Sequence, residues 1–344
     1  MAKTRNITFD LMKGVTILLM MIVHLVCRDT GSFTHFCNSF HMPLFFILAG
    51  LFAKDVNAIP SFKQYTIKNA KRLLLPLYVT MLFRVAWGGF QAYLKHDISY
   101  LLQPTLSMLV ASPDGWETQW GLVYTGPMWF LVALFWIREF FYGLQLALNN
   151  LDPKYRDLGI LGISIVLSII AVIVYPHIAP FPFGLTQAFT SMAFYALGYY
   201  IYRHPFPKWV YALSVLVWPF AIHYGSVSLA FCTIDYYPLS FIGACGGTYV
   251  IYLLCKGWSK VLSYISSLNI KHATVNFTSP LTWCGVNSLA ILCMHELELY
   301  SGFLYSIICR VPQAAYLVGW GEVLIAIVMA LIVLNMPVLK KVYK

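Results

Sequence analysis

The chain alternates between long apolar runs and short polar segments. The apolar runs reach about 20 residues, the length that a helix needs to cross roughly 30 Å of hydrocarbon at 1.5 Å per residue. Each run is therefore a candidate transmembrane helix. The pattern predicts ten of them, at about 10–27, 39–54, 73–90, 126–148, 158–175, 186–202, 209–224, 238–255, 281–299 and 316–338.

The composition leads to the same fold class. Of the 344 residues, 60% are hydrophobic and 10% are charged, whereas a soluble domain carries roughly 25% charged residues. No repeat and no low-complexity linker divides the chain. We therefore expect an all-α, polytopic membrane bundle of about ten transmembrane helices, with residues 1–344 forming a single domain.

The positive charge indicates how this bundle is oriented. The net charge is +10, but the basic residues are scattered between apolar runs and form no continuous face for nucleic acid. With the N-terminus inside, 18 of the 23 basic residues lie in cytoplasmic segments, and the outer loops hold Arg28, Lys95 and Arg310. The positive-inside rule then predicts both termini in the cytoplasm. We expect a multi-pass protein of the plasma (inner) membrane, with residues 91–125 as its longest outer loop.

The eight cysteines show no CxxC pair and no metal-ligand spacing. We expect no metal site and no disulfide framework. A pair between Cys27 and Cys37 across a short outer loop is left open.

Ionisable residues inside a membrane are costly, and they indicate function unless a local partner explains them. Lys13 and His24 are eleven residues apart, about 16 Å along a helix and nearly on one face. His41, His295 and Glu296 are predicted at a depth similar to that of His24. Interfacial histidines satisfied by water or a carbonyl are the alternative. The pattern favours function for His24 and leaves His41 and His295 open.

Further charges and aromatic residues carry two interpretations each. Lys68, Lys71 and Arg72 share a helical face that suits phosphates, but they also fit ordinary topology-setting charge that attracts anionic membrane lipid. Four other residues belong to predicted spans. Arg84 and Arg138, with Glu139, are candidates to pair and line a cavity, and Trp129 fits either a pocket wall or an interfacial aromatic belt.

Six segments of the chain resemble one known family. They are DLMKGVTILLMMIVH (10–24), SFHMPLFFILAG (39–50), KRLLLP (71–76), GPMWFLVALF (126–135), FYALGYYI (194–201) and GVNSLAILCMH (285–295). Their order and spacing closely resemble the acyltransferase 3 family of integral-membrane O-acyltransferases. The chain looks most like the branch similar to fucose 4-O-acetylases.

The resemblance implies transfer of an acyl group, usually acetyl, from cytoplasmic acyl-CoA to a hydroxyl of a sugar or lipid-linked glycan at the outer face. Acetyl-CoA would be a co-substrate, and no permanently bound cofactor is expected. The family's basic residue, ten intervening positions and histidine match Lys13 and His24. Its paired-basic motif maps onto Lys68, Lys71 and Arg72, with lysine where many members have arginine.

These residues suggest a mechanism. His24 would act as the base that takes the acceptor's proton, and the basic cluster would hold the CoA phosphates. Whether His24 acts only as base or is itself transiently acylated is left open. His41 or His295 would orient His24, stabilise the oxyanion or bind acceptor hydroxyls. Glu296, Trp129, Arg84 and Arg138 are candidate substrate-binding residues. A transporter of a glycolipid or small anion is the main alternative, although no inverted repeat supports it.

Overall fold

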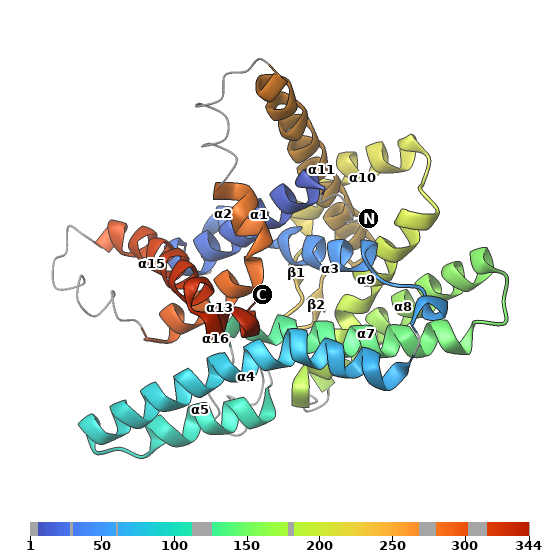
Figure 1. The fold of residues 1–344 in the computed structure, drawn as a ribbon. Coiled ribbons are helices and arrows are strands. Elements are labelled where there is room, and N and C mark those ends of the chain that lie inside the picture. The colour runs from blue at the N-terminus through green and yellow to red at the C-terminus, as the bar shows by residue number, and fades with distance from the viewer. Residues whose placement is uncertain are drawn as a thin grey trace.

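The structure is a computed structural model that describes residues 6–27, 30–59, 61–111, 126–177, 182–267, 280–301 and 315–343. The described chain is mostly helical (Figure 1). Its helices are α1 (Ile7–Met21), continued by the π-helical turn η1 (Ile22–Val26), α2 (Gly31–Asn38), α3 (His41–Leu51), α4 (Phe62–Lys95), α5 (Ser99–Val110), α7 (Trp129–Ala147), α8 (Pro153–Val174), α9 (Leu185–Arg203), α10 (Lys208–Tyr224), α11 (Tyr237–Ser267), α13 (Ser288–Ser301), α15 (Ala315–Asn335) and α16 (Pro337–Tyr343).

Shorter elements join these helices. They are the 3-10 turns η2 (Val56–Ala58), η3 (Gly126–Met128), η4 (Tyr175–His177) and η5 (Pro182–Gly184), and the antiparallel strands β1 (Val227–Ser228) and β2 (Thr233–Ile234). Residues 280–286 are also helical and lead into α13. The hairpin of β1 and β2 is a small departure from the all-α fold that the apolar pattern predicts.

Each of the ten predicted spans contains a helix, so the helical character of these segments is confirmed. Among the described residues, six helical segments are long and apolar enough to cross a membrane. They are Ile7–Val26, Phe62–Lys95, Gly126–Ala147, Pro153–His177, Tyr237–Val261 and Val318–Asn335. The number of ten spans and the orientation with both termini inside stay predictions.

Helix α9 shows why a helix at the centre of the bundle can be less apolar than one at its rim. It packs against α3, α7 and α8. Thr186, Gln187, Thr190 and Ser191 are all buried on it, between 0% and 4% exposed. These residues face protein, where polar groups are tolerated better than against lipid tails. A hydropathy scan therefore gives such a helix a low score even though it lies inside the bundle.

Two glycines allow α3 and α9 to cross in backbone contact. A Cβ on Gly50 would lie 1.9 Å from the carbonyl oxygen of Tyr195, and one on Gly198 would lie 2.0 Å from that of Ile47. Neither position has room for a side chain. Small residues allow this close approach in membranes, where van der Waals contact holds helices together.

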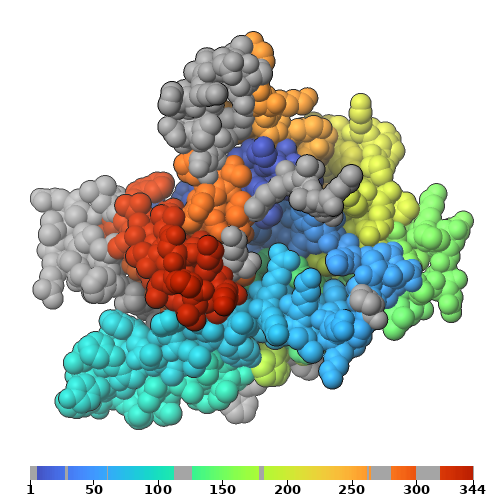
Figure 2. Space-filling model, in the orientation of Figure 1, coloured from blue at the N-terminus to red at the C-terminus, as the bar shows by residue number. Residues whose placement is uncertain are grey.

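The buried core lies where α1, α3, α4, α7, α9 and α13 meet. Met21, Phe46, Ile137, Phe194 and Ile291 are all 0% exposed and belong to one cluster. The C-terminal helices close one side of this core. The surface of α16, in red, lies against that of α4, in cyan (Figure 2), and α15 packs on α16. Tyr343, near the end of α16, is 2% exposed, and its hydroxyl lies 3.1 Å from Oγ1 of Thr80 on α4.

One expectation needs correction, and one question that the sequence left open is answered. Part of the predicted outer loop at 91–125 is helical, because α4 continues to Lys95 and α5 then packs back along it (Figure 1). Gly88 makes this contact possible, since a Cβ there would lie 2.3 Å from the carbonyl oxygen of Tyr100. The rest of that loop, 112–125, lies outside the described residues. Cys27 and Cys37 are free thiols, so the disulfide left open above is not formed.

Candidate active site

A cavity of about 600 Å³ lies in the interior of the bundle. Its walls come from α1, α3, α4, α7, residues 285–292 and the end of α16, with the turn between β1 and β2 on one side. Six of the residues predicted from the sequence line it: Lys13, His24, His41, Arg72, Trp129 and Arg138. The fold thus brings together residues that are up to 125 positions apart in the chain.

One face of the first helix forms a wall of this cavity along its length. Lys13, Ile17, Met20 and His24 all line it. His24 lies in η1, where the helix widens into a π-helical turn, and such turns are frequent at functional sites. The eleven-residue spacing therefore places the ammonium group and the imidazole in one cavity, at opposite ends of about 16 Å of helix.

Three cations gather at what we call the basic end, defined by Lys13, Arg72 and Arg138. Arg138 Nη1 donates to Oδ1 of Asn69 at 3.4 Å, which places it beside the turn of α4 that carries Arg72. Arg72 is exposed as well as cavity-lining, so the cavity opens to the surface there.

Lys13 reaches the same region from α1. Its Nζ lies 6.0 Å above the ring of Phe52, at the C-terminal end of α3, and 3.1 Å from Oδ1 of Asp10. Asp10 offsets the charge of Lys13 in part. Arg138 and Arg72 then supply much of the positive charge at the basic end, and the site can hold an anion there.

The other end, which we call the histidine end, contains His24 and His41. His41 is the first residue of α3, eleven residues from Phe52, and is 5% exposed. Its Nδ1 lies 2.8 Å from the carbonyl oxygen of Cys37. A carbonyl only accepts hydrogen bonds, so Nδ1 carries the proton and Nε2 is the basic nitrogen of the neutral ring. Trp129 is 4% exposed and lines the same cavity from α7.

His295 lies behind His24, away from the cavity surface. The two rings stack with their centroids 5.6 Å apart and an interplanar angle of 24°. His295 is 0% exposed, and neither of its ring nitrogens has a hydrogen-bond partner among the described residues. The sequence predicts a catalytic role for it, and this geometry favours positioning of the His24 ring.

Arg84 and Glu296 pair with each other. Arg84 Nη1 lies 2.6 Å from Glu296 Oε1, and both side chains are 2% exposed. Neither lines the cavity formed by the described residues. The sequence-based pairing of Arg84 with Arg138 and Glu139 is therefore wrong, since Glu139 instead accepts hydrogen bonds from Asn69 and Thr66 on α4.

The pair is also packed against the start of α7. Gly126 has a φ of +62°, and a Cβ there would lie 1.8 Å from Oε2 of Glu296. Only glycine fits this conformation and this contact without strain. Glu296 therefore connects Arg84 on α4, His295 on its own helix, and the turn that leads to Trp129.

The basic residues of α4 are divided between the cavity and the surface. Lys68 and Lys71 are exposed and do not line the cavity of the described residues, whereas Arg72 does. The sequence grouped all three because they share one face of the helix. Packing of α4 against α7 turns only part of that face inward.

Several cavity residues were not identified from the sequence. Strand β1 and the turn that follows it contribute five consecutive residues, 227–231, and Asn38 and Tyr343 add two polar side chains. Gln187 Nε2 on α9 donates to the carbonyl oxygen of Ala230 at 3.0 Å and holds the turn in place. The signal that was available is the V-S-L alternation at 227–229, typical of a short strand.

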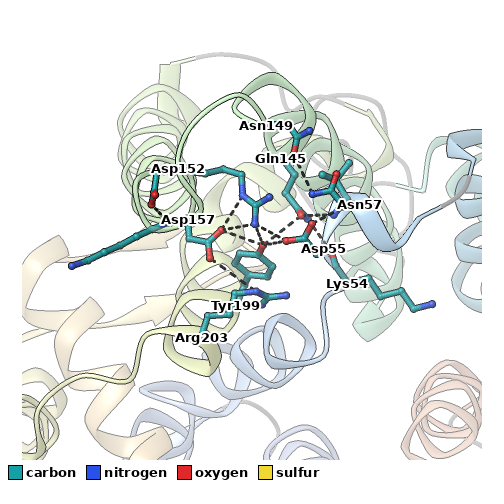
Figure 3. Close-up of polar contacts among 12 residues, drawn as sticks. Lys54, Asp55, Asn57, Gln145, Asn149, Asp152, Asp157, Tyr199 and Arg203 are labelled. Atoms are coloured by element: carbon teal, nitrogen blue, oxygen red, sulfur yellow. Dashed lines mark hydrogen bonds and ion pairs between the residues drawn. The ribbon is translucent and has the colours of Figure 1, made fainter.

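A second polar cluster joins the segment after α3 to α7, α8 and α9 (Figure 3). Arg156 Nη2 lies 2.5 Å from Asp55 Oδ2 and 3.1 Å from Asp157 Oδ1. The hydroxyl of Tyr199 lies within 3.4 Å of Asp55 and 3.3 Å of Asp157. The amide of Val56 donates to Gln145 Oε1 at 2.8 Å. This cluster fixes the segment that precedes α4.

The pKa of Asp55 is below its ordinary value. Partial burial favours the neutral carboxyl, but hydrogen bonds from the Asn57 amide and the Arg156 guanidinium outweigh it, aided by the charges of Arg156 and Arg203. Asp55 is therefore ionised at neutral pH.

As for metals, no group of three or more His, Cys, Asp or Glu side chains is placed to hold an ion within the described ranges.

Comparison with known proteins identifies the family. A family described as "Acyltransferase domain", the acyltransferase 3 family, matches residues 6–334. The chain belongs to this family. The match covers nearly the whole sequence and includes the residues that define both ends of the cavity, the basic end and the histidine end. The family membership expected from the six segments is thereby confirmed, and members of this family are membrane proteins.

A curated relative matches a smaller part. The chain is 35% identical over 85 residues to "Nodulation protein NolL" of Sinorhizobium fredii (strain NBRC 101917 / NGR234). The match covers 22% of this chain and 23% of that protein. The chain therefore matches less than a quarter of the length of this relative. No solved structure matches the chain significantly.

Proposed function

We propose that this acyltransferase moves an acyl group, acetyl in the simplest case, from acyl-CoA to a hydroxyl of a sugar or lipid-linked glycan. The observation that carries the proposal is that Lys13 and His24 line the same cavity, at opposite ends of one face of α1 and η1. With the predicted orientation, the basic end faces the cytoplasm of the cell, and the histidine end faces outward across its plasma membrane.

The basic end suits the phosphates of CoA. Arg72 and Arg138 are guanidinium groups, which bind phosphate oxygens with two parallel hydrogen bonds. Lys68 and Lys71 continue the positive charge along the exposed part of α4. The pantetheine arm would then follow Ile17 and Met20, which are apolar and line the cavity between its two ends.

At the histidine end, His24 acts as general base. The acceptor oxygen attacks the thioester carbonyl carbon while the His24 imidazole takes the hydroxyl proton. The tetrahedral intermediate collapses as the C–S bond breaks, and the imidazolium returns the proton to the leaving thiolate. The products are an ester and free CoA. His41, whose Nε2 is the basic nitrogen, contributes by binding an acceptor hydroxyl or by stabilising charge near the thioester.

Thiol release measures the reaction. Purified protein incubated with acetyl-CoA and a glycan acceptor should release free CoA and form an acetyl ester. His24→Ala should lower the rate by at least about 100-fold, the usual contribution of a general base. His177→Ala is the matched control, because His177 is exposed at the end of η4 and should leave the rate unchanged.

Two results would overturn the proposal. A folded His24→Ala protein with a normal rate would exclude His24 as the base. Acetyl-CoA that stays intact with every acceptor, while a labelled glycolipid or small anion crosses reconstituted vesicles, would favour the transporter alternative.

A further inference from the structure

A second cavity lies behind the first one. It has a volume of about 700 Å³ and lies between α1, α3 and the group α8 to α11. Helices α1 and α3 separate the two spaces. Met12 faces the second cavity where its neighbour Lys13 faces the first, and Leu48 lines the second whereas Phe45 lines the first. We call this second cavity the rear groove.

The interior of the rear groove is built for an apolar occupant. Most of its lining side chains are aliphatic or aromatic. The two aliphatic hydroxyl groups in it are both satisfied by their own helices: Ser214 Oγ donates to the carbonyl of Tyr211, and Thr248 Oγ1 to that of Ala244, each at 2.8 Å. Because these hydroxyls already donate to backbone carbonyls, a bound molecule needs no polar partner along this stretch.

One end of the groove is cationic rather than apolar. Lys256 lines it there, with its Nζ 5.3 Å from the ring centroid of Tyr252. Tyr252, Tyr249 and Tyr211 form a row of stacked rings that leads to this lysine. Lysine with tyrosine is the combination that membrane proteins place at the boundary between hydrocarbon and headgroups. The groove is therefore amphipathic along its length.

The groove is also open to its surroundings. Leu213 and Ile242 line it and are 49% and 40% exposed. Both belong to helices of the membrane bundle, so the surrounding medium is lipid rather than water. An apolar groove with one cationic end matches a molecule with an apolar chain and one anionic end.

We propose that the rear groove binds one acyl chain of an anionic glycerophospholipid, with the phosphate beside Lys256. The chain lies along the apolar wall formed by α9, α10 and α11. The lipid then packs against the side of α1 and α3 opposite the acyl-transfer cavity. It is a bound lipid distinct from the donor and the acceptor of the reaction.

Lipid retention tests the proposal. The full-length protein is incubated in detergent with equal amounts of phosphatidylglycerol and phosphatidylcholine of the same chains, and native mass spectrometry measures the lipids that remain bound. Phosphatidylglycerol should be preferred. Lys256→Glu should lower this preference about fivefold, the effect of one lysine near an anionic lipid surface. Lys154→Glu is the matched control, because Lys154 is exposed on α8 outside the groove.

A second measurement locates the acyl chain. Cys245 is a free, partly buried thiol that lines the groove. Its alkylation by N-ethylmaleimide, followed by peptide mass mapping, should be several times slower with phosphatidylglycerol than after delipidation. Equal alkylation rates would overturn the site. So would an unchanged lipid preference in Lys256→Glu, or an equal loss of preference in Lys154→Glu.

Discussion

At the level of single residues, Arg84 and Glu296 form the most deeply buried ion pair of the described chain. Their 2.6 Å contact joins α4 to α13, one residue from the ring that stacks on His24. Breaking a buried pair by removing one charge costs about 3–5 kcal/mol, because the other charge stays in a medium of low polarity. The pair thus contributes to the geometry of the histidine end without lining the cavity.

Glu296→Gln tests this role. The substitution should lower the apparent midpoint of thermal unfolding in detergent and reduce kcat, with little change in the KM for the acceptor. The double variant Arg84→Met/Glu296→Met should recover part of the lost stability, since it leaves no unpaired charge. A higher acceptor KM with normal stability would instead support the substrate-binding role predicted from the sequence.

Some site residues follow from local geometry and others do not. Lys13 and His24 belong to one helix, so their common face could be predicted from eleven residues of spacing. Glu296 and Arg84 are 212 residues apart, and no local pattern pairs them. The division of Lys68, Lys71 and Arg72 between surface and cavity likewise depends on how α4 rotates against α7.

At the level of elements, the hairpin of β1 and β2 supplies a non-helical part of the cavity wall. Ser228 of β1 and residues 229–231 of the turn line the cavity, and Gln187 holds the turn at Ala230. We expect this turn to contact the acceptor.

Ser228→Trp should raise the acceptor KM about tenfold, because a large side chain would occupy acceptor space. The KM for acetyl-CoA should stay unchanged, because the proposal places the CoA phosphates at the basic end and the acceptor at the turn. Thr233→Trp is the control, as Thr233 pairs with Ser228 but does not line the cavity. Equal effects of both substitutions on both KM values would contradict the assignment.

The polar cluster around Asp55 gives a second prediction at this scale (Figure 3). The pKa of Asp55 is lowered in the folded protein. Its contribution to stability is therefore complete above the pKa of the unfolded chain, about 4, and is lost as the pH falls through the lower folded value.

Asp55→Asn should destabilise the protein at pH 6 by about 1.5–3 kcal/mol, the range for a hydrogen bond to a charged group. The difference from the natural protein should shrink as the pH is lowered toward 3, measured by the unfolding midpoint. Asp152→Asn should show no such difference, because asparagine caps the start of α8 as well as aspartate does. A difference for Asp55→Asn that is constant with pH would exclude the charge as its cause.

At the level of the whole molecule, the direction of the cavity relative to the membrane determines which substrate enters from which side. The excess of positive charge in alternate segments predicts that the basic end faces the cytoplasm. A membrane-impermeant maleimide added to intact cells should label Asp97→Cys at the end of α4. Lys154→Cys, at the start of α8, should be labelled only after permeabilisation. The reverse pattern would invert the predicted orientation and the proposed direction of transfer.

The resemblance of six segments indicated the family. Apart from the family, the sequence by itself determined the helical membrane class, the presence of a helix in each of the ten apolar runs and the shared face of Lys13 and His24. All of these depend on composition or on spacing within one segment, where the helical period is known in advance. The tertiary structure alone decided which charges pair, which basic residues reach the cavity and that a hairpin forms part of its wall. Those outcomes depend on contacts between distant segments, and no local period encodes how two helices rotate against each other.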